Sequence, residues 1–431
     1  MIVSSPRPRA RHAGRPPRRP PASARRRRLR TAAAVAVAAA ASACGDVPAA
    51  LSIPDARAPD AAAADAAAPP VPTWPPAAPI PDAIDFPPWL TLPAPDRVVV
   101  SWRTVAPTRG GVRYTSDRGG GVVLSPSLAV LHQVELGPLV PGTRYRYEVF
   151  IDGTDVSLPG VFTTPGGSRW RFVHLAEFHA ASEADHVARF TEAIRAFEPN
   201  AVVHSGDMCD SGDDLADWRS FFRTAAPWTA NAFLLPAHSN HVNGPAGNGN
   251  ALALFVLPDA QRWYHTRFGD TSIYTLDSTY DGANPDVGSA QLDWLRSTLA
   301  AERASTAPPR FVIGAWHYPA CSSHYASRAD QHQWVVDHIL PAFADAGGVD
   351  LVLTGHDKYY ERSTIAGGPV HVMANAGRLR PGSPGGTPDV CAPQVTDTAT
   401  RSVGLYEVGP DGITAVVVGD GGSVIDQFSV P

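Results

Sequence analysis

Lysine is almost absent from this sequence: Lys358 is the only one among 431 residues, and the other 35 of the 36 basic residues are arginines. Eleven arginines lie within the first 30 residues, so the rest of the chain carries 25 basic residues against 41 acidic ones. This balance argues against nucleic-acid binding by the folded part of the protein. The length and the hydrophobic content of 44% predict a globular protein with two folded units and tails.

The sequence also lacks an apolar run of about 20 residues, the length that a helix needs to span a bilayer. Instead, the arginine-rich start precedes the short apolar run Thr31–Ala43, which ends in small residues before Cys44. This pattern predicts a signal peptide at residues 1–44. Cys44 after small residues resembles a bacterial lipobox, with a conventional A-x-A cleavage nearby as the alternative. Either interpretation predicts an exported protein of the bacterial cell envelope, lipid-anchored or periplasmic or extracellular.

Cysteine is scarce as well, with four in the whole chain. After Cys44, the remaining three are Cys209, Cys321 and Cys391. An exported protein permits a disulfide, and an odd number of cysteines leaves one thiol free. We prefer the pair Cys321 and Cys391 because Cys209 lies in a motif described below, although the sequence alone does not decide the pairing.

The region before the α/β part of the chain divides into a linker and an all-β segment. Residues 45–88 are rich in Ala, Pro and Asp, and such a segment buries too little surface to offset its ordering entropy, so it reads as a disordered linker. Residues 89–165 contain Leu139–Tyr145, which is typical of the tyrosine corner of a Greek-key sandwich. They also contain apolar residues at the period of a half-buried strand: Val98, Val100 and Trp102. We expect a β-sandwich, with a stand-alone adhesive module as the alternative.

After residue 166, strand-like and helix-like segments alternate, which predicts an α/β domain that extends to residue 431. Ser182 and Asp185 predict the start of one amphipathic helix that Pro199 ends, and Gln291–Leu299 predicts another. Near the end, Pro410–Gly412 between two apolar runs predicts a hairpin. Five segments read as buried strands: Arg171–Ala176, Ala201–Ser205, Ala232–Ala237, Phe311–Trp316 and Asp350–Thr354.

Polar side chains with the chemistry of metal ligands follow each of these five strands. In chain order they are Glu177 and His179, Asp207, Asn240 and His241, His317, and His356 with Lys358 two residues later. Strand ends are where an α/β sheet offers side chains to a ligand. Carboxylate and amide oxygens interleaved with imidazoles suit a pair of divalent metals bridged by a carboxylate.

This order and setting resemble the calcineurin-like metallophosphoesterase superfamily, whose pattern is D-x-H, G-D, G-N-H-[D/E], H and G-H-x-H. The all-β segment resembles the fibronectin type III-like domain that precedes the catalytic domain in purple acid phosphatases. The resemblance implies a sandwich followed by a four-layer α/β/β/α metallophosphoesterase domain at residues 166–431. Asp210 stands where purple acid phosphatases have an iron-binding tyrosine, so a purple ferric centre is not expected.

The resemblance also implies two metal sites that share Asp207. It places the second metal on Asp207, Asn240, His317 and His356, whose nitrogen and oxygen atoms fit Zn²⁺, Mn²⁺ or Fe²⁺. It places the first metal on Glu177, His179, Asp207 and the position of Lys358. Because a protonated ammonium has no lone pair and repels a cation, the sequence predicts one competent site and an altered first site.

Three alternatives stay open for Lys358. Its ammonium group lies between Glu177 and Asp207 in place of the first metal, or it turns to solvent while a weakened metal stays on Glu177, His179 and Asp207. The third alternative is a decayed site that binds no metal.

The implied activity is hydrolysis of a phosphate ester by metal-activated water, with Asp207 at the centre and His241 placed to protonate the leaving group. The implied partner is a phosphorylated small molecule or another phosphate ester, with membrane contact through the lipid anchor alone. The alternative is a catalytically weak or inactive surface lipoprotein that uses the fold as a binding scaffold. Four departures from the family pattern favour that alternative: Glu177, Ser239, Val242 and Lys358.

If the lipobox interpretation is right, the mature protein begins at a lipid-modified Cys44 and partitions with membranes, because an acylated cysteine would precede the linker. Intact-mass spectrometry of the membrane and soluble fractions tests this expectation. An unmodified soluble protein cut near Ala43 would contradict it.

Overall fold

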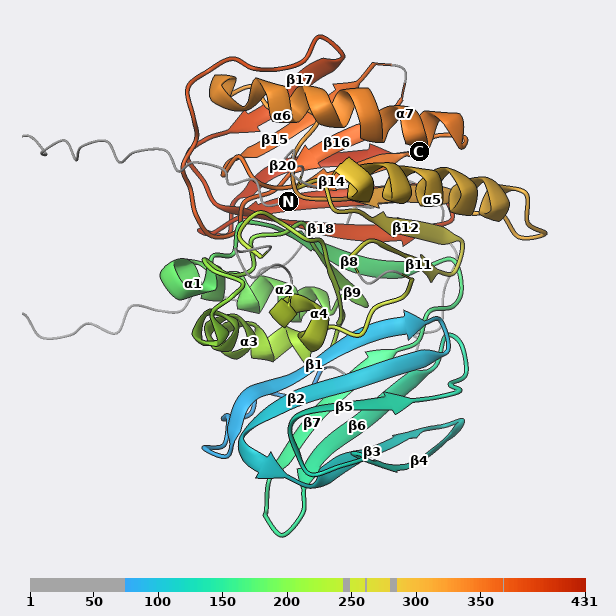
Figure 1. Cartoon of the computed structure of the whole chain (residues 1–431), viewed down its shortest axis with the longest axis vertical. Coiled ribbons are helices and arrows are strands. Elements are labelled where there is room, and N and C mark those ends of the chain that lie inside the picture. The colour runs from blue at the N-terminus through green and yellow to red at the C-terminus, as the bar shows by residue number, and fades with distance from the viewer. Residues whose placement is uncertain (1–73, 243–248, 260–261, 280–284, 367) are drawn as a thin grey trace, which may run out of the picture. The chain divides into compact units, whose positions relative to one another are not determined.

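The structure is a computed structural model that describes residues 74–242, 249–259, 262–279, 285–366 and 368–431 (Figure 1). The predicted signal peptide, Cys44 and most of the predicted linker lie outside the described residues. None of the described helices has the length and hydropathy needed to cross a membrane.

Within the described residues, the largest sheet has nine strands in the order β20-β19-β18-β8-β9-β10-β1-β2-β5. They are β1 (Ile84–Ala94), β2 (Arg97–Thr108), β5 (Ala129–Leu136), β8 (Trp170–Leu175), β9 (Ala201–His204), β10 (Phe233–Pro236), β18 (Ser402–Gly409), β19 (Gly412–Gly419) and β20 (Val424–Val430). Strands β8, β9 and β10 are parallel, and β1 joins β10 in parallel through Leu90 opposite Phe233. The N-terminal β segment and the α/β segment therefore share one sheet. The predicted hairpin is confirmed, since β18 pairs with β19 up to Gly409 opposite Gly412.

The second sheet is antiparallel, with the described strands in the order β4-β3-β6-β7. They are β3 (Gly110–Ser116), β4 (Gly119–Leu124), β6 (Arg144–Ile151) and β7 (Ser157–Thr163). Tyr145 and Tyr147 of β6 share one buried hydrophobic cluster with Val98 and Trp102 of β2. The Tyr145 hydroxyl accepts the Val140 N–H at 3.0 Å, which is the hydrogen bond of a tyrosine corner. These contacts support a sandwich, while its fibronectin type III-like identity stays a prediction.

The third sheet has the order β11-β12-β13-β14-β16-β15-β17 among the described strands, and β12, β13, β14 and β16 are parallel. Its members are β11 (Tyr264–Phe268), β12 (Thr271–Thr275), β13 (Phe311–Ala315), β14 (Leu351–Thr354), β15 (Tyr360–Ile365), β16 (Val370–Met373) and β17 (Cys391–Asp397). Alternate residues of β13 enter different cores: Ile313 packs with residues of the nine-stranded sheet, and Val312 packs with helical residues. Both faces of the sheet are therefore buried, as parallel sheets require. The four-layer order itself stays a prediction.

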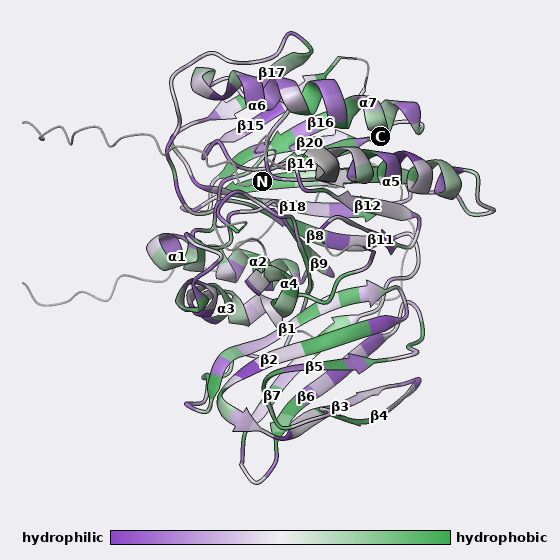
Figure 2. Ribbon diagram, viewed as in Figure 1, coloured by the Kyte–Doolittle hydropathy of each residue, from purple (hydrophilic) through white to green (hydrophobic). Residues whose placement is uncertain are grey.

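The described α-helices are α1 (Ala180–Ala188), α2 (Thr191–Phe197), α3 (Leu215–Thr229), α4 (Gly249–Leu254), α5 (Pro285–Arg303), α6 (Ala329–Trp334) and α7 (Leu340–Asp345). A short 3₁₀ helix, η1 (Ala326–Arg328), precedes α6, and a π-helical segment, η2 (Val335–Ile339), follows it. Figure 1 shows α5, α6 and α7 over the third sheet. In Figure 2, α5 and α6 carry both hydrophobic and hydrophilic residues, as helices with one buried face do. The helix predicted at Gln291–Leu299 is confirmed as part of α5.

The single helix predicted from Ser182 to Pro199 is wrong, because the chain forms α1 and α2 instead. The N-terminal cap of α1 is His179, in the left-handed region at φ 45°, so Ser182 lies inside the helix. The break follows from the backbone, which tightens where Phe190 N–H bonds to Val187 O, three residues back. That turn buries the ring of Phe190 in the core.

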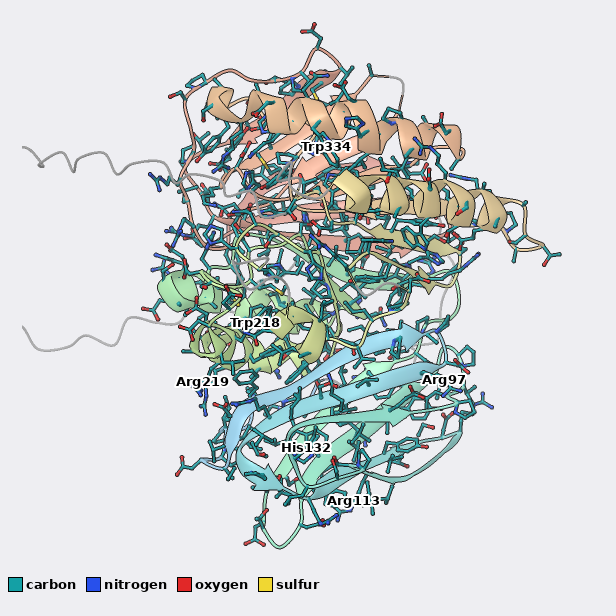
Figure 3. All side chains as sticks on the ribbon, in the orientation of Figure 1. Arg97, Arg113, His132, Trp218, Arg219 and Trp334 are labelled. Atoms are coloured by element: carbon teal, nitrogen blue, oxygen red, sulfur yellow. A yellow bond between two sulfur atoms is a disulfide. The ribbon has the colours of Figure 1, made fainter. Side chains whose placement is uncertain are left out.

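The start of the β segment also differs from the expectation, since β1 begins at Ile84 within the predicted linker. Pro87 and Pro88 argued against a strand in the sequence, because proline cannot donate a hydrogen bond to a neighbouring strand. Proline is nevertheless tolerated in strands at bulges. The register with β2 does shift between Phe86 and Trp89. Arg219 of α3, labelled in Figure 3, forms an ion pair with the buried Asp85 of β1.

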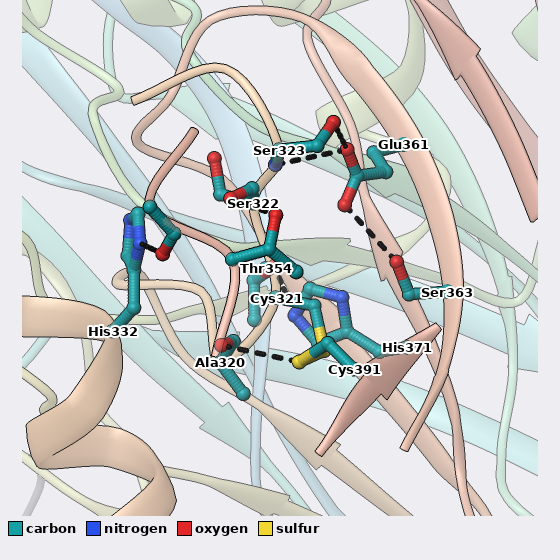
Figure 4. The surroundings of a disulfide bond; sticks show 12 residues. Ala320, Cys321, Ser322, Ser323, His332, Thr354, Glu361, Ser363, His371 and Cys391 are labelled. Atoms are coloured by element: carbon teal, nitrogen blue, oxygen red, sulfur yellow. Dashed lines mark hydrogen bonds between the residues drawn. A yellow bond between two sulfur atoms is a disulfide. The ribbon is translucent and has the colours of Figure 1, made fainter. Parts of the chain in front are cut away.

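The disulfide preferred from the sequence is confirmed: Cys321 is bonded to Cys391, and Cys209 is a buried free thiol. Figure 4 shows this bond beside Ala320, Ser322 and Ser323. Cys321 lies four residues after His317, so the bond ties the loop that follows β13 to the start of β17.

Candidate metal centre

The five polar segments meet at one edge of the molecule's two parallel strand sets, because each follows the carboxyl end of a strand: β8, β9, β10, β13 or β14. Asp207 is the common neighbour. Within 4 Å of its carboxylate oxygens lie His179 Nε2 (3.5 Å), His317 Nε2 (3.2 Å), His241 Nε2 (4.0 Å) and Lys358 Nζ (3.8 Å). The structure therefore brings together side chains from segments up to 181 residues apart, including Lys358 and Glu177.

The backbone at this centre is strained. Of the seven described residues other than glycine with positive φ, five belong to the candidate site: Glu177 (61°), His179 (45°), Asp207 (54°), His356 (76°) and Lys358 (63°). Such residues persist only where their surroundings over-determine them, and they cluster at functional sites. Gly206, beside Asp207, is required by close packing, since a Cβ there would lie 2.5 Å from His317 Nδ1.

The predicted second site has converging donors. His317 Nε2 lies 3.2 Å from Asp207 Oδ1, 3.0 Å from Asn240 Oδ1 and 3.2 Å from His356 Nδ1. The other nitrogen of His317, Nδ1, donates to the Ser205 carbonyl at 2.8 Å, which turns Nε2 toward this group. Four donors from four strand ends thus face one another.

The surroundings shift the pKa values of the two histidines of the second site in opposite directions. Burial lowers the pKa of His317, but Asp207 and Glu177 together outweigh it, so the pKa of His317 lies above its ordinary value. Burial and the neighbouring His317 hold the pKa of His356 well below its ordinary value. Two imidazole nitrogens 3.2 Å apart form a hydrogen bond only when one carries a proton and the other presents its lone pair.

The donor set fits a divalent metal. The donors of the second site meet Asp207 at Oδ1, whereas its other oxygen, Oδ2, faces His179, His241 and Lys358 and has no hydrogen-bond partner among the described residues. Asp207, His317 and His356 offer ligand atoms that all lie within 4.8 Å of one another. Two imidazoles, a carboxylate and an amide oxygen suit Zn²⁺, Mn²⁺ or Fe²⁺.

At the predicted first site, Lys358 adopts the first of the three arrangements considered from the sequence: its ammonium group lies between Glu177 and Asp207. Lys358 Nζ donates to Glu177 Oε2 at 2.6 Å and lies 3.8 Å from Asp207 Oδ2, and its side chain is only 7% exposed. The other oxygen of Glu177 accepts the His356 N–H, so both oxygens of this carboxylate are engaged. Glu177 is thus a partner of the ammonium group.

Charge pairing maintains this arrangement. Burial raises the pKa of Glu177, but Lys358, the hydrogen bond with His179 and the nearby His317 together outweigh that effect, so the pKa of Glu177 lies below its ordinary value. Burial lowers the pKa of Lys358, but Glu177 and Asp207 together raise it by more, so the pKa of Lys358 lies above its ordinary value. The pair is therefore ionised at neutral pH.

His179 and His241 face Asp207 from the other side, and their rings meet edge to face at 88° with centroids 4.7 Å apart. With Asp207 they form a second group of three possible metal ligands. His241 Nδ1 donates to the Asp210 carbonyl at 2.7 Å, which leaves Nε2 toward the site. The His241 side chain is 30% exposed, whereas His179 and His317 are fully buried. His241 can therefore meet a molecule that enters from solvent.

Two polar side chains outside the five segments were not predicted from the sequence. Gln331 of α6 lies 3.1 Å from His356 Nε2 through its amide oxygen. Arg378, after β16, donates to Asp210 Oδ1 at 2.7 Å and, through its backbone N–H, to the Glu177 carbonyl at 3.1 Å. Neither lies in a recognisable motif, so no local signal in the sequence could have marked them.

Comparison with known families agrees with this geometry. Residues 171–360 match the family model of the calcineurin-like phosphoesterases. This segment contains every candidate ligand named above, and the α/β part of the chain has the calcineurin-like phosphoesterase fold.

Relatives support the phosphoesterase fold at a distance. An uncharacterized protein of Mycobacterium tuberculosis is 29% identical over 63% of this chain, which spans 60% of that relative's length. A probable cyclic nucleotide phosphodiesterase of Rhodococcus erythropolis is 25% identical over 47% of this chain and 69% of its own. A solved purple acid phosphatase from yellow lupin (Lupinus luteus) seeds superimposes with a TM-score of 0.66 over 79% of this chain and 73% of its own, at 16% identity. That likeness extends the shared fold beyond the phosphoesterase segment.

Removal of one partner of the buried ion pair tests the arrangement of Lys358. We expect Lys358→Met to lower the free energy of unfolding in metal-free buffer by about 3–5 kcal/mol, because it leaves the Glu177 carboxylate buried without its cation. Adding Glu177→Gln to Lys358→Met recovers most of that loss. Urea denaturation at neutral pH with a chelator measures both changes.

The matched control is Arg296→Met, which removes an exposed ion pair with Asp345 and changes stability by less than about 1 kcal/mol. Equal stability of Lys358→Met and the parent protein would show that Lys358 does not neutralise Glu177.

Proposed function

We propose that this protein hydrolyses phosphate esters with one divalent metal held by Asp207, Asn240, His317 and His356. The observation that carries the proposal is the convergence of these four donors from strand ends, with His317 Nε2 lying within 3.2 Å of Asp207 Oδ1, Asn240 Oδ1 and His356 Nδ1. The family match over residues 171–360 supports the reaction class. We also propose that the protein is exported and anchored through Cys44, as the sequence predicts.

A divalent metal bound there would supply Lewis acidity toward a phosphoryl oxygen and an attacking water. The chain's own residues supply the rest. His241 presents Nε2 at the solvent-accessible side of Asp207, with its Nδ1 proton held by the Asp210 carbonyl, so it is placed to protonate a leaving oxygen. Lys358 adds a fixed positive charge beside Asp207, where an anionic phosphate would be stabilised.

The relatives favour phosphate mono- or diesters as substrates, since one is described as a purple acid phosphatase and another as a probable cyclic nucleotide phosphodiesterase. A second candidate function is a surface protein that uses the fold as a binding scaffold. The specific observation that favours it is the engagement of both Glu177 oxygens by Lys358 and the His356 N–H, which takes this ligand away from a first metal.

The protein as purified is expected to hold about one divalent metal per chain, since the donors of the second site converge while Lys358 occupies the first. His317→Ala or His356→Ala abolishes that binding, and removal of the metal with a chelator abolishes hydrolysis. Elemental analysis of the purified chain measures the content, with the exposed His338→Ala as the control that keeps it. Two tightly held metals in the unmodified chain would overturn the one-metal proposal.

Lys358→His is expected to restore metal binding at the first site and to raise phosphoesterase activity about 10- to 100-fold, more so when combined with Glu177→Asp. The change removes a buried cation and supplies an imidazole lone pair. Hydrolysis of p-nitrophenyl phosphate and bis-p-nitrophenyl phosphate, with and without Mn²⁺ or Zn²⁺, measures the gain.

The control for this substitution is Lys358→Met, which removes the charge and supplies no ligand. If Lys358 binds the phosphate itself, Lys358→His without added metal lowers the activity instead. No hydrolysis by either protein at any metal concentration would favour the scaffold.

A further inference from the structure

One short helix contacts the end of the last motif from outside the five segments. Helix α6 and the residue before it place Arg328, Gln331 and His332 against His356 and Asp357. Arg328 Nη1 donates to the His356 carbonyl at 2.8 Å and to Asp357 Oδ1 at 2.6 Å. His332 Nε2 lies 2.9 Å from Asp357 Oδ2. Both oxygens of the fully buried Asp357 are thus held, one by Arg328 at the end of η1 and the other by His332 of α6.

This contact holds a strained backbone. His356 and Lys358, on either side of Asp357, have φ values of 76° and 63°, in the region that residues with a side chain seldom adopt. A segment of this kind stays in place only when its neighbours hold it. Arg328 and His332 hold the residue between the two strained positions.

Gln331 acts on the ring of His356 itself. Its amide oxygen lies 3.1 Å from His356 Nε2, while His356 Nδ1 faces His317 Nε2. A carbonyl oxygen only accepts, so this contact keeps the proton of a neutral imidazole on Nε2 and its lone pair on Nδ1. The lone pair then points into the proposed metal site, and the ring orientation is set by the same hydrogen bond.

The helix itself departs from regular geometry at this place. The π-helical segment η2 follows α6 directly, and π-helical turns are rare and occur frequently at functional sites.

We infer that Gln331 is a positioning residue that sets the tautomer and orientation of His356, and that it thereby determines the affinity of the second site for a divalent metal. This inference rests on the proposed function because it concerns the same site, but it requires metal binding and not hydrolysis. Gln331 is not proposed to touch the substrate.

The test is a titration of metal-free protein with Zn²⁺ or Mn²⁺ in competition with a chelating dye. Gln331→Leu is expected to weaken the affinity about 10- to 100-fold, the usual effect of losing the partner of a metal-ligating histidine. Gln331→Glu keeps an acceptor at this position and adds negative charge, so it retains or raises the affinity. Gln333→Leu is the matched control, since Gln333 lies on the same helix, is exposed and donates only to Asp337 in the described contacts.

A thermal melt of each metal-free variant separates positioning from folding. Equal affinity of Gln331→Leu and the parent protein would overturn the inference. So would an equal loss in the leucine and glutamate variants that follows their loss of thermal stability, because a merely structural residue is not rescued by an acceptor. Metal binding with the expected pattern but without hydrolysis would contradict the proposed function and leave this inference standing, whereas a parent protein that binds no divalent metal would overturn both.

Discussion

Two carboxylates buried at one point, those of Glu177 and Asp207, are the constraint on which the rest of the centre depends. Burial of an ionised carboxylate is unfavourable unless a cation or hydrogen-bond donors compensate it. In this chain the compensation comes from Lys358, which lies within 4 Å of both, and from His317 beside Asp207, whose pKa is raised above its ordinary value by the two carboxylates. A divalent metal bound at the second site would compensate the charge of Asp207 in place of a proton on His317, whereas Lys358 already compensates the charge of Glu177.

The fold supplies the strained geometry that this charge cluster needs. Each residue in the left-handed region costs about 1–2 kcal/mol, and Asp207 and four of its neighbours are such residues. The surrounding structure holds them in place through the hydrogen bond from Arg328 to Asp357, the close approach of Gly206 to His317, and the hydrogen bond from the Arg378 N–H to the Glu177 carbonyl. The disulfide between Cys321 and Cys391 adds a covalent tie close to His317. Contacts from several separate elements of the α/β domain therefore hold the backbone of the site.

The sole lysine, Lys358, places a positive charge where the family pattern has a metal ligand. Its ammonium group is a compact charge that shifts its protonation with its surroundings, whereas arginine stays charged and is larger. In a chain whose other basic residues are all arginine, the position between Glu177 and Asp207 holds the one side chain that fits a point charge into a site of nearly zero exposure. That makes Lys358 the residue whose replacement separates a one-metal enzyme from a scaffold.

Local patterns were enough to predict the five buried strands, the closing hairpin and the type of side chain after each strand, because apolar periodicity and turn residues act over a few neighbours. They were not enough for β1, where Pro87 and Pro88 concealed a strand that a bulge accommodates, or for the break at Phe190. The sequence also left three arrangements for Lys358 and named no partner for His356. Only the tertiary structure placed the ammonium group on Glu177 and the amide of Gln331 on His356, because both contacts join side chains far apart in the chain, and their geometry depends on how separate strands and helices pack.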